Sequence, residues 1–203
     1  MSEITAQDVA ALRKATGAGM MDAKRALEEA GGDAERAADI LREKGLADAK
    51  KRSERATNEG TIGHYLHVQA DRPVIGVLVE LVSETDFVAK SEGFQEAARD
   101  IAMHVAAYRP QWVTRDEVPE DVLAKEQELI AAQARNEGKP AEIVDKIVEG
   151  RLNSFYADNC LYDQQFVNPE KFDGTVAQMI DQMVSTMGEN IGVRRFIRLG
   201  IGE

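Results

Sequence analysis

The 203-residue chain has one cysteine, few aromatic residues and no long apolar run. The single cysteine, Cys160, excludes an intramolecular disulfide. We expect it to fill a small buried space, with an intersubunit bridge or a reactive thiol as the alternatives. No apolar run approaches the ~18 residues that a spanning helix needs, so no membrane partner is expected. The first ten residues lack the basic region and apolar stretch of a signal peptide, which favours a cytoplasmic protein.

The chain is also short of basic residues. It has 25 Lys and Arg against 36 Asp and Glu, which gives a formal net charge of −11. A nucleic-acid groove needs Lys and Arg to displace counterions from phosphates, so direct binding of nucleic acid is disfavoured. A protein or small-molecule partner is favoured instead. The deficit is uneven, because residues 1–58 hold 11 residues of each sign and the acidic excess lies after them.

The first part of the chain has the pattern of three short helices. Thr5 and Asp8 have the spacing of a capping box, and Asp33 is a good N-cap for a later helix. The three predicted helices run from about 6 to 16, from 21 to 30, and from the Asp33 cap to a stop at Gly45. So small a bundle has a thin core, and adjacent helical positions point about 100° apart. At least one of Met20 and Met21 is therefore expected near the surface, with a partly buried core position as an equal alternative.

A basic run and a polar junction end this helical region. The basic residues within 50–55 are followed by the helix-ending stretch 57–60. This junction predicts a three-helix domain with a basic linker, 1–56, and a second domain, 57–203. The basic run could recruit RNA or an acidic surface, but cations on a short linker helix are more often solvated or paired.

The second domain combines strands with helices. Residues 61–69 alternate between two faces and 74–82 are almost continuously apolar, so they predict a hairpin whose second strand is central. A strand over 191–200 completes a small antiparallel sheet. The predicted helices are one after Ser91, a hairpin of 119–136 and 140–156, and a last one over 175–187. The fold class is therefore α+β: a three-helix bundle, then a small antiparallel sheet packed with helices and a helical hairpin.

The segment 83–90 joins the central strand to the next helix, a place where functional groups are often displayed. Its Phe87 either packs into the core, the commoner fate of a loop aromatic, or acts as a rigid plug for a partner's pocket. Glu84 and Asp86 could work as an acid–base pair. No nucleophile, third group or glycine cradle accompanies them, so enzymatic chemistry has weak support.

No metal site and no cofactor are predicted. His64 and His67 are three residues apart on a strand, so they point to opposite faces, and no cysteine lies nearby. The glycines of 17–19 imitate the start of a dinucleotide-binding fingerprint. The third glycine is missing, however, and a helix precedes the loop where a strand is required.

Two long motifs resemble those of one family. Residues 12–60 read LRKATGAGMMDAKRALEEAGGDAERAADILREKGLADAKKRSERATNEG, which resembles the N-terminal ubiquitin-associated-like domain and linker of bacterial translation elongation factor Ts. Residues 84–94, ETDFVAKSEGF, are similar to that family's TDFV signature, and IAMHVAA and KPAEIVDKIVEGRL also fit in order. The resemblance implies a non-enzymatic guanine-nucleotide exchange factor. Such a factor binds the GDP complex of elongation factor Tu, disturbs its magnesium site and promotes GDP release during protein synthesis.

The same resemblance implies roles for particular residues. The resemblance implies that the signature residues displace the partner's magnesium; they are Thr85, Asp86, Phe87 and Val88. Within this set, Phe87 is the implied wedge between partner side chains. The resemblance also implies that Arg13, Met20 and Met21 contact the partner's nucleotide domain. His67 resembles a core histidine that lies near the partner.

Longer members of the family carry two tandem cores with a coiled-coil insertion, whereas 203 residues leave room for one core. The chain resembles the short form, which pairs two chains to rebuild the double core, so a homodimer is expected. The alternatives are a plain adaptor that captures a partner without remodelling it and a small acidic hydrolase that uses Glu84 and Asp86. Only the exchange factor predicts faster nucleotide release.

Overall fold

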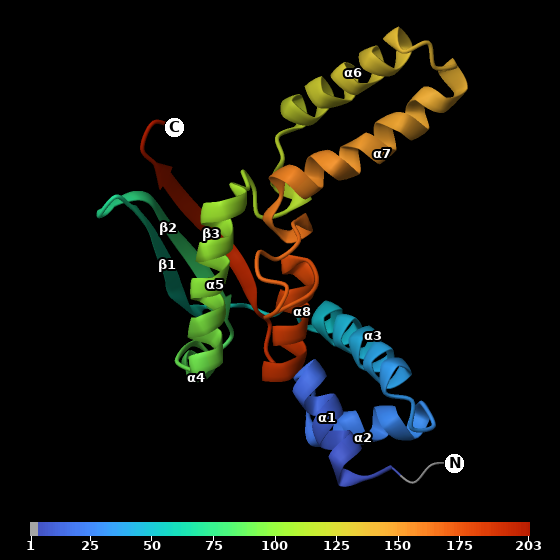
Figure 1. Cartoon of the computed structure of the whole chain (residues 1–203), viewed down its shortest axis with the longest axis vertical. Helices are drawn as coiled ribbons and strands as arrows, with labels where there is room; N and C mark the ends of the chain where they lie inside the picture. The colour runs from blue at the N-terminus through green and yellow to red at the C-terminus, as the bar shows by residue number, and fades with distance from the viewer. Residues whose placement is uncertain (1–3) are drawn as a thin grey trace. The chain divides into compact units, whose positions relative to one another are not determined.

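The computed structural model describes residues 4–203, except for the side chain of Leu46. Its helices are α1 Ala6–Thr16, α2 Met20–Glu29, α3 Ala34–Arg52, α4 Asp86–Ala89, α5 Glu92–Tyr108, α6 Glu120–Asn136, α7 Ala141–Asn159 and α8 Val176–Met187, with 3-10 turns at Arg115–Glu117 and Leu161–Asp163. Its strands are β1 Glu59–Gln69, β2 Arg72–Ser83 and β3 Gly192–Gly200 (Figure 1). The α+β class is confirmed. Within 4–203, no helix has the length and apolarity needed to cross a membrane.

The chain forms two compact units, each assembled from three separated stretches. The first unit comprises Met1–Thr61, Leu81–Gln95 and Gln178–Gly192. The second comprises Ile62–Glu80, Glu96–Ala177 and Val193–Glu203. The domain division at residue 56, which follows chain order, stays a prediction.

Helices α1 to α3 of the first unit begin and pack as their sequences indicate. The Thr5 hydroxyl accepts from the Asp8 N–H while the Asp8 carboxylate accepts from the Thr5 N–H, so the capping box is present. Asp33 is the N-cap of α3, and its carboxylate accepts from the N–H groups of Glu35 and Arg36. Val9 and Leu12 of α1 are buried in a cluster with apolar residues of α2 and α3, and this cluster is the core of the three-helix bundle.

The prediction that Gly45 ends the third helix is wrong, because α3 continues to Arg52. Gly45 is buried, and a Cβ atom there would lie 3.5 Å from the Cβ of Ser185 on α8. Glycine in a helix interior costs about 1 kcal/mol relative to alanine. The 3.5 Å separation is an ordinary van der Waals contact, so α3 packs against α8 at this position, and this tertiary packing outweighs the intrinsic preference.

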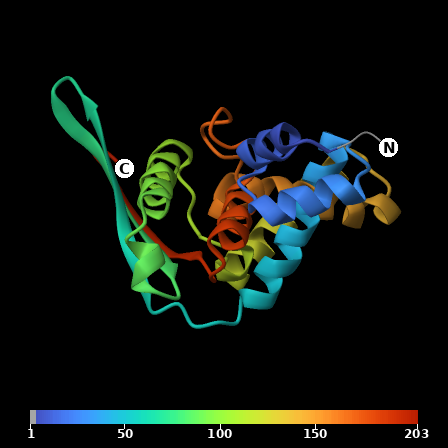
Figure 2. The same ribbon diagram turned by 90° about the horizontal axis from the view of Figure 1, so that it is seen from below.

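The sheet of three strands has the order β1-β2-β3, so β2 is central, as predicted. Ala70 and Asp71, with φ of 49° and 61°, form the two-residue turn of the hairpin. Helix α5 covers one side of the sheet (Figure 2). Gly63 permits this, because a Cβ atom at that position would lie 2.0 Å from the carbonyl oxygen of Ala98 on α5.

The other side of the sheet carries a group of exposed aliphatic side chains. We call it the outer sheet face, and its side chains are 50% to 67% exposed: Ile62, Leu66, Val68, Leu78, Ile197 and Leu199. Their alternation with inward residues follows the period of two of a strand. In β2, for example, Val77 and Val79 on either side of Leu78 are buried. The burial pattern therefore leaves this face without cover in the isolated chain.

Helices α6 and α7 form the predicted hairpin, and α7 ends at Asn159, three residues later than expected. Gly138, with φ of +73°, makes the turn between them. Cys160 follows α7 and is completely buried, as predicted. Burial raises the pKa of its thiol to about 11, so the thiolate form is suppressed at neutral pH.

Candidate functional site

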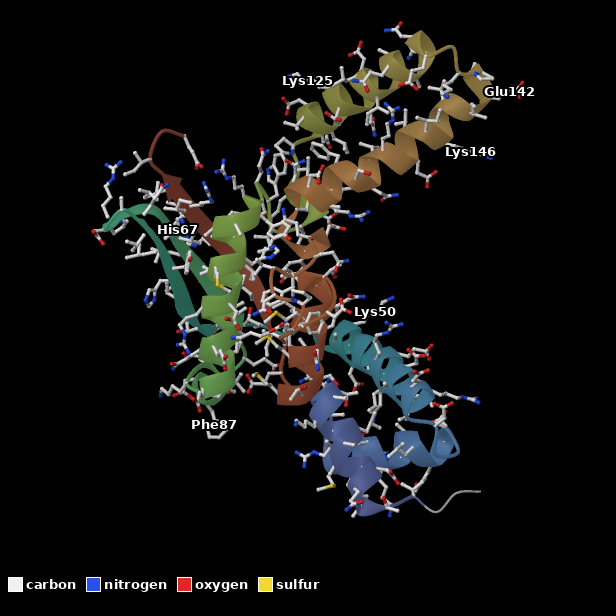
Figure 3. The ribbon with its side chains drawn as sticks, in the orientation of Figure 1. Lys50, His67, Phe87, Lys125, Glu142 and Lys146 are labelled. Atoms are coloured by element: carbon white, nitrogen blue, oxygen red, sulfur yellow. The ribbon has the colours of Figure 1, made fainter. Side chains whose placement is uncertain are left out.

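Phe87 lies on α4, a four-residue helix between β2 and α5 that the sequence pattern did not reveal. Its side chain is 83% exposed, whereas the next two residues, Val88 and Ala89, are buried. Figure 3 shows the ring directed away from the ribbon. Of the two fates considered for this aromatic residue, packing into the core is therefore excluded. Its buried neighbours anchor the short helix and leave the ring free to contact another molecule.

Polar bonds hold the start of α4. Thr85 is the N-cap, with extended backbone, and its hydroxyl accepts from the Val88 N–H. The completely buried Ser83 donates from its hydroxyl to the carbonyl oxygen of Thr85 at 3.0 Å. The backbone before Phe87 is therefore tied down from inside the protein.

Asp86, beside Phe87, pairs with Lys90 one turn later, with 2.6 Å between the carboxylate oxygen and the ammonium nitrogen. The hydrogen bond from Lys90 lowers the pKa of the Asp86 carboxyl, and the pKa of Lys90 is raised by the same contact. Asp86 is thus a carboxylate at neutral pH. A general acid needs a pKa shifted the other way, so the pair suits electrostatics and not proton transfer.

Glu84 has a structural task. Its carboxylate accepts from the Asn190 N–H at 2.6 Å and pairs with Arg55 at 3.4 Å. Both partners belong to the first unit. The acid–base pair of Glu84 and Asp86 is not supported, because each carboxylate is engaged with its own donors.

Glu189 is a residue of this site that the sequence reasoning missed. Its carboxylate accepts from the Thr85 N–H at 3.0 Å and from the Thr85 hydroxyl at 2.6 Å. The two residues are 104 positions apart, so no local spacing pattern could have linked them.

Met20 and Met21, at the start of α2, are 54% and 64% exposed. The open question between surface and core is thereby answered for both. The loop before them is fixed, since Gly17 takes φ of +70° and the Gln182 amide of α8 donates to the Thr16 carbonyl at 2.6 Å. The two exposed thioether side chains can contact another molecule, and they belong to the same unit as Phe87.

Arg13 is also exposed, near the same loop. Its Nε donates to the carbonyl oxygen of Ala18 at 3.3 Å, which holds the side chain over the turn between α1 and α2. Among residues 4–203 no other partner of the Arg13 guanidinium is found, so its remaining N–H donors can serve another molecule.

His67 lies on β1 in the second unit, a different unit from the one that contains Phe87. Its side chain is exposed, and its Nδ1 is 3.4 Å from the Tyr65 hydroxyl. Within residues 4–203, no group of three or more His, Cys, Asp or Glu side chains could hold a metal ion.

The basic run, which occupies the last turn of α3 and continues to Arg55, is largely paired. Lys51 and Arg52 each lie 3.8 Å from the carboxylate of Asp48, and Arg55 pairs with Glu84. The interpretation that these cations are solvated or paired is supported. With the acid neighbours in place, the run does not form the uninterrupted basic surface that a phosphate backbone requires.

Comparison with known proteins shows which family the chain is similar to. The model of the family described as "Elongation factor TS" matches residues 5–173. The elongation factor Ts of Fervidobacterium nodosum is 53% identical over 201 residues, which cover 99% of this chain and 100% of that protein. That of Geobacter metallireducens is 52% identical over 200 residues, covering 98% and 90% of the two chains. That of Moorella thermoacetica is 52% identical over 200 residues, covering 98% and 96%.

Proposed function

Because the chain belongs to the elongation factor Ts family, the nucleotide exchange factors of elongation factor Tu, we propose that residues 85–88 carry its exchange activity. The chain is a short bacterial form of this family and a non-catalytic factor of translation elongation. We infer that it acts in the cytoplasm, where elongation factor Tu acts.

The observation that carries the proposal is the exposure of Phe87. Phe87 is 83% exposed at the tip of an anchored helix, and an aromatic side chain presented in this way can serve as the anchor of a contact with another protein. In this assignment Phe87 enters a pocket of elongation factor Tu near its magnesium ion. Asp86 brings a carboxylate beside that ion, and Thr85 and Val88 hold the helix that presents both residues.

A second contact involves the N-terminal helices. Arg13, Met20 and Met21 bind the nucleotide domain of elongation factor Tu, with methionine side chains that adapt to an uneven apolar surface. These residues belong to the same compact unit as Phe87, which supports their acting together on one partner. His67 makes a separate contact from the second unit.

An exchange factor needs no catalytic base. It must bind the nucleotide-free partner more tightly than the GDP-bound partner, and GDP must weaken factor binding by the same ratio. A differential of ~5.5 kcal/mol gives ~10⁴-fold. Burial of Phe87 and a disturbed magnesium site supply such a differential, because both occur only once the nucleotide site has opened.

Replacement of the ring tests this role. Phe87→Ala should lower the maximal rate of GDP release about 10- to 100-fold, since full burial of such a side chain contributes ~1.5–3 kcal/mol. The measurement is stopped-flow release of fluorescent methylanthraniloyl-GDP from elongation factor Tu. Leu129→Ala is the control, because Leu129 is also exposed, at 52%, but lies on α6. Release by Phe87→Ala as fast as by the unaltered chain would show that the wedge assignment is wrong.

The outer sheet face supports a homodimer. Its aliphatic side chains belong to three hydrogen-bonded strands, so together they make one broad apolar surface. A patch of this kind on a soluble protein marks an interface. The occupant is a second copy of this chain, because a single-core chain paired across this face has two cores. We therefore expect a pair of chains in solution.

A further inference from the structure

Glu189 is connected to the segment that bears Phe87 by both of its carboxylate oxygens. One oxygen accepts from the Thr85 N–H at 3.0 Å and the other from the Thr85 hydroxyl at 2.6 Å. Charge-assisted hydrogen bonds of this kind are about twice as strong as neutral ones. Gly188, with φ of +76°, ends α8 and turns the chain toward Thr85.

The bonds continue into α4. The Thr85 hydroxyl donates to Glu189 and accepts from the Val88 N–H at 3.4 Å, so Glu189 also orients the oxygen that caps the helix. A helix of four residues has no stability of its own. Its direction, and hence the direction of Phe87, depends on these cap bonds and on the buried Val88 and Ala89.

The neighbouring Asn190 extends the connection to the linker. Its N–H donates to Glu84, and its side-chain amide donates to the carbonyl oxygens of Arg55 at 2.7 Å and Ser53 at 3.2 Å. Two consecutive residues after α8 therefore hold both the segment before Phe87 and the chain that follows α3.

We propose that Glu189 is a positioning residue for nucleotide exchange, which holds Phe87 in its inserting direction before the partner arrives. The proposal rests on the wedge role of Phe87 given above. Ordering a loop during binding costs free energy, and a loop ordered in advance avoids that cost. Glu189 touches neither nucleotide nor magnesium in this role, and it acts through Thr85 on the ring.

The test uses the full chain and stopped-flow release of methylanthraniloyl-GDP from elongation factor Tu, at a series of factor concentrations. Glu189→Ala should lower the maximal release rate about tenfold. Its half-saturating concentration should change less, because the contacts of the N-terminal helices remain. Glu189→Gln keeps an oxygen for the Thr85 N–H and gains an amide donor for the Thr85 hydroxyl, so it should release GDP within about twofold of the unaltered chain.

A double variant separates positioning from a merely structural effect. If Glu189 acts through the ring, Glu189→Ala should cause no further loss in a chain that already carries Phe87→Ala. The proposal would be overturned if the two substitutions reduced the release rate independently, so that their effects multiplied. It would also be overturned if Glu189→Gln released GDP as slowly as Glu189→Ala, or if Glu189→Ala released GDP as fast as the unaltered chain. If Phe87→Ala itself has no effect, the wedge role fails first, so the two failures are distinguishable.

Further controls separate a local effect of Glu189→Ala from loss of charge or of the fold. Glu128→Ala on α6 removes the same charge from an exposed position and should leave release unchanged. Hydrogen exchange of residues 83–90 should be faster in Glu189→Ala and unchanged in α6 and α7. If Glu189→Ala does not fold, Thr85→Val replaces it, because it keeps the backbone donor and loses the hydroxyl. A release rate equal to that of the unaltered chain would then overturn the proposal.

Discussion

Phe87 and the outer sheet face expose apolar surface in two different ways. Phe87 is one aromatic ring, 83% exposed, on a four-residue helix held by hydrogen bonds from distant residues. The outer sheet face consists of aliphatic side chains, each about half exposed, on three paired strands. A small, sharply placed contact suits a partner that binds and leaves in every cycle, whereas a broad aliphatic face suits a lasting interface.

The largest expected effect comes from a charge in the outer sheet face. In the proposed dimer, Leu78→Asp places two carboxylates in the interface, so the dimer dissociation constant should rise about 10³-fold or more. Light scattering at several concentrations should report twice 22.3 kDa for the unaltered chain and 22.3 kDa for the variant.

The matched control is Leu129→Asp, since Leu129 is 52% exposed on α6 and Leu78 is 50% exposed on β2. This variant should stay a dimer, as should Phe87→Ala. An unaltered chain that is monomeric at every concentration contradicts the pairing.

The next effect concerns the N-terminal contact. Met20→Ala combined with Met21→Ala should raise the factor concentration for half-maximal GDP release by about 5- to 30-fold. The reason is that it removes two of the proposed apolar contacts, which bind all states of the partner alike. The maximal rate should stay near that of the unaltered chain. Titration of the release rate against factor concentration separates this result from that of Phe87→Ala. The control is Ile143→Ala, because Ile143 is an exposed aliphatic residue on α7. Equal losses in both quantities would show that the two contacts are not distinct.

The smallest effect is expected at the ion pair beside Phe87. Lys90→Ala removes the main cause of the lowered pKa of Asp86, so this pKa should move back toward 3.8. Asp86 is ionised at neutral pH in both forms, and release at pH 7 should change less than about twofold.

The pH dependence has a definite sign. A lowered pKa in the folded state favours the folded chain above the ordinary value of 3.8, and this contribution disappears as the pH falls through the lowered pKa. NMR titration of the Asp86 carboxyl measures the shift. An unchanged pKa in the variant means that Lys90 is not its cause.

Local patterns predicted most of the fold. The Thr5 capping box, the apolar run of β2 and the hairpin of α6 and α7 depend on residues close together in the chain, and each is confirmed. Gly45 is an exception, because α3 continues through it while packing against Ser185, which lies on a helix far along the chain. The pattern of β1 also indicated two faces without saying which of them stays exposed.

For the candidate site, the sequence revealed the residue types and the family resemblance that they carry. It did not reveal the geometry in which these residues are arranged. Sequence alone determined the fold class, the non-enzymatic exchange function and the partner, because long runs of residues carry those signals. Only the tertiary structure decided that Phe87 points outward, that Met20 and Met21 are both exposed, and that Glu189 holds Thr85. The contact between Glu189 and Thr85 joins residues 104 positions apart, and exposure depends on what packs over a side chain, so no local spacing records either of them.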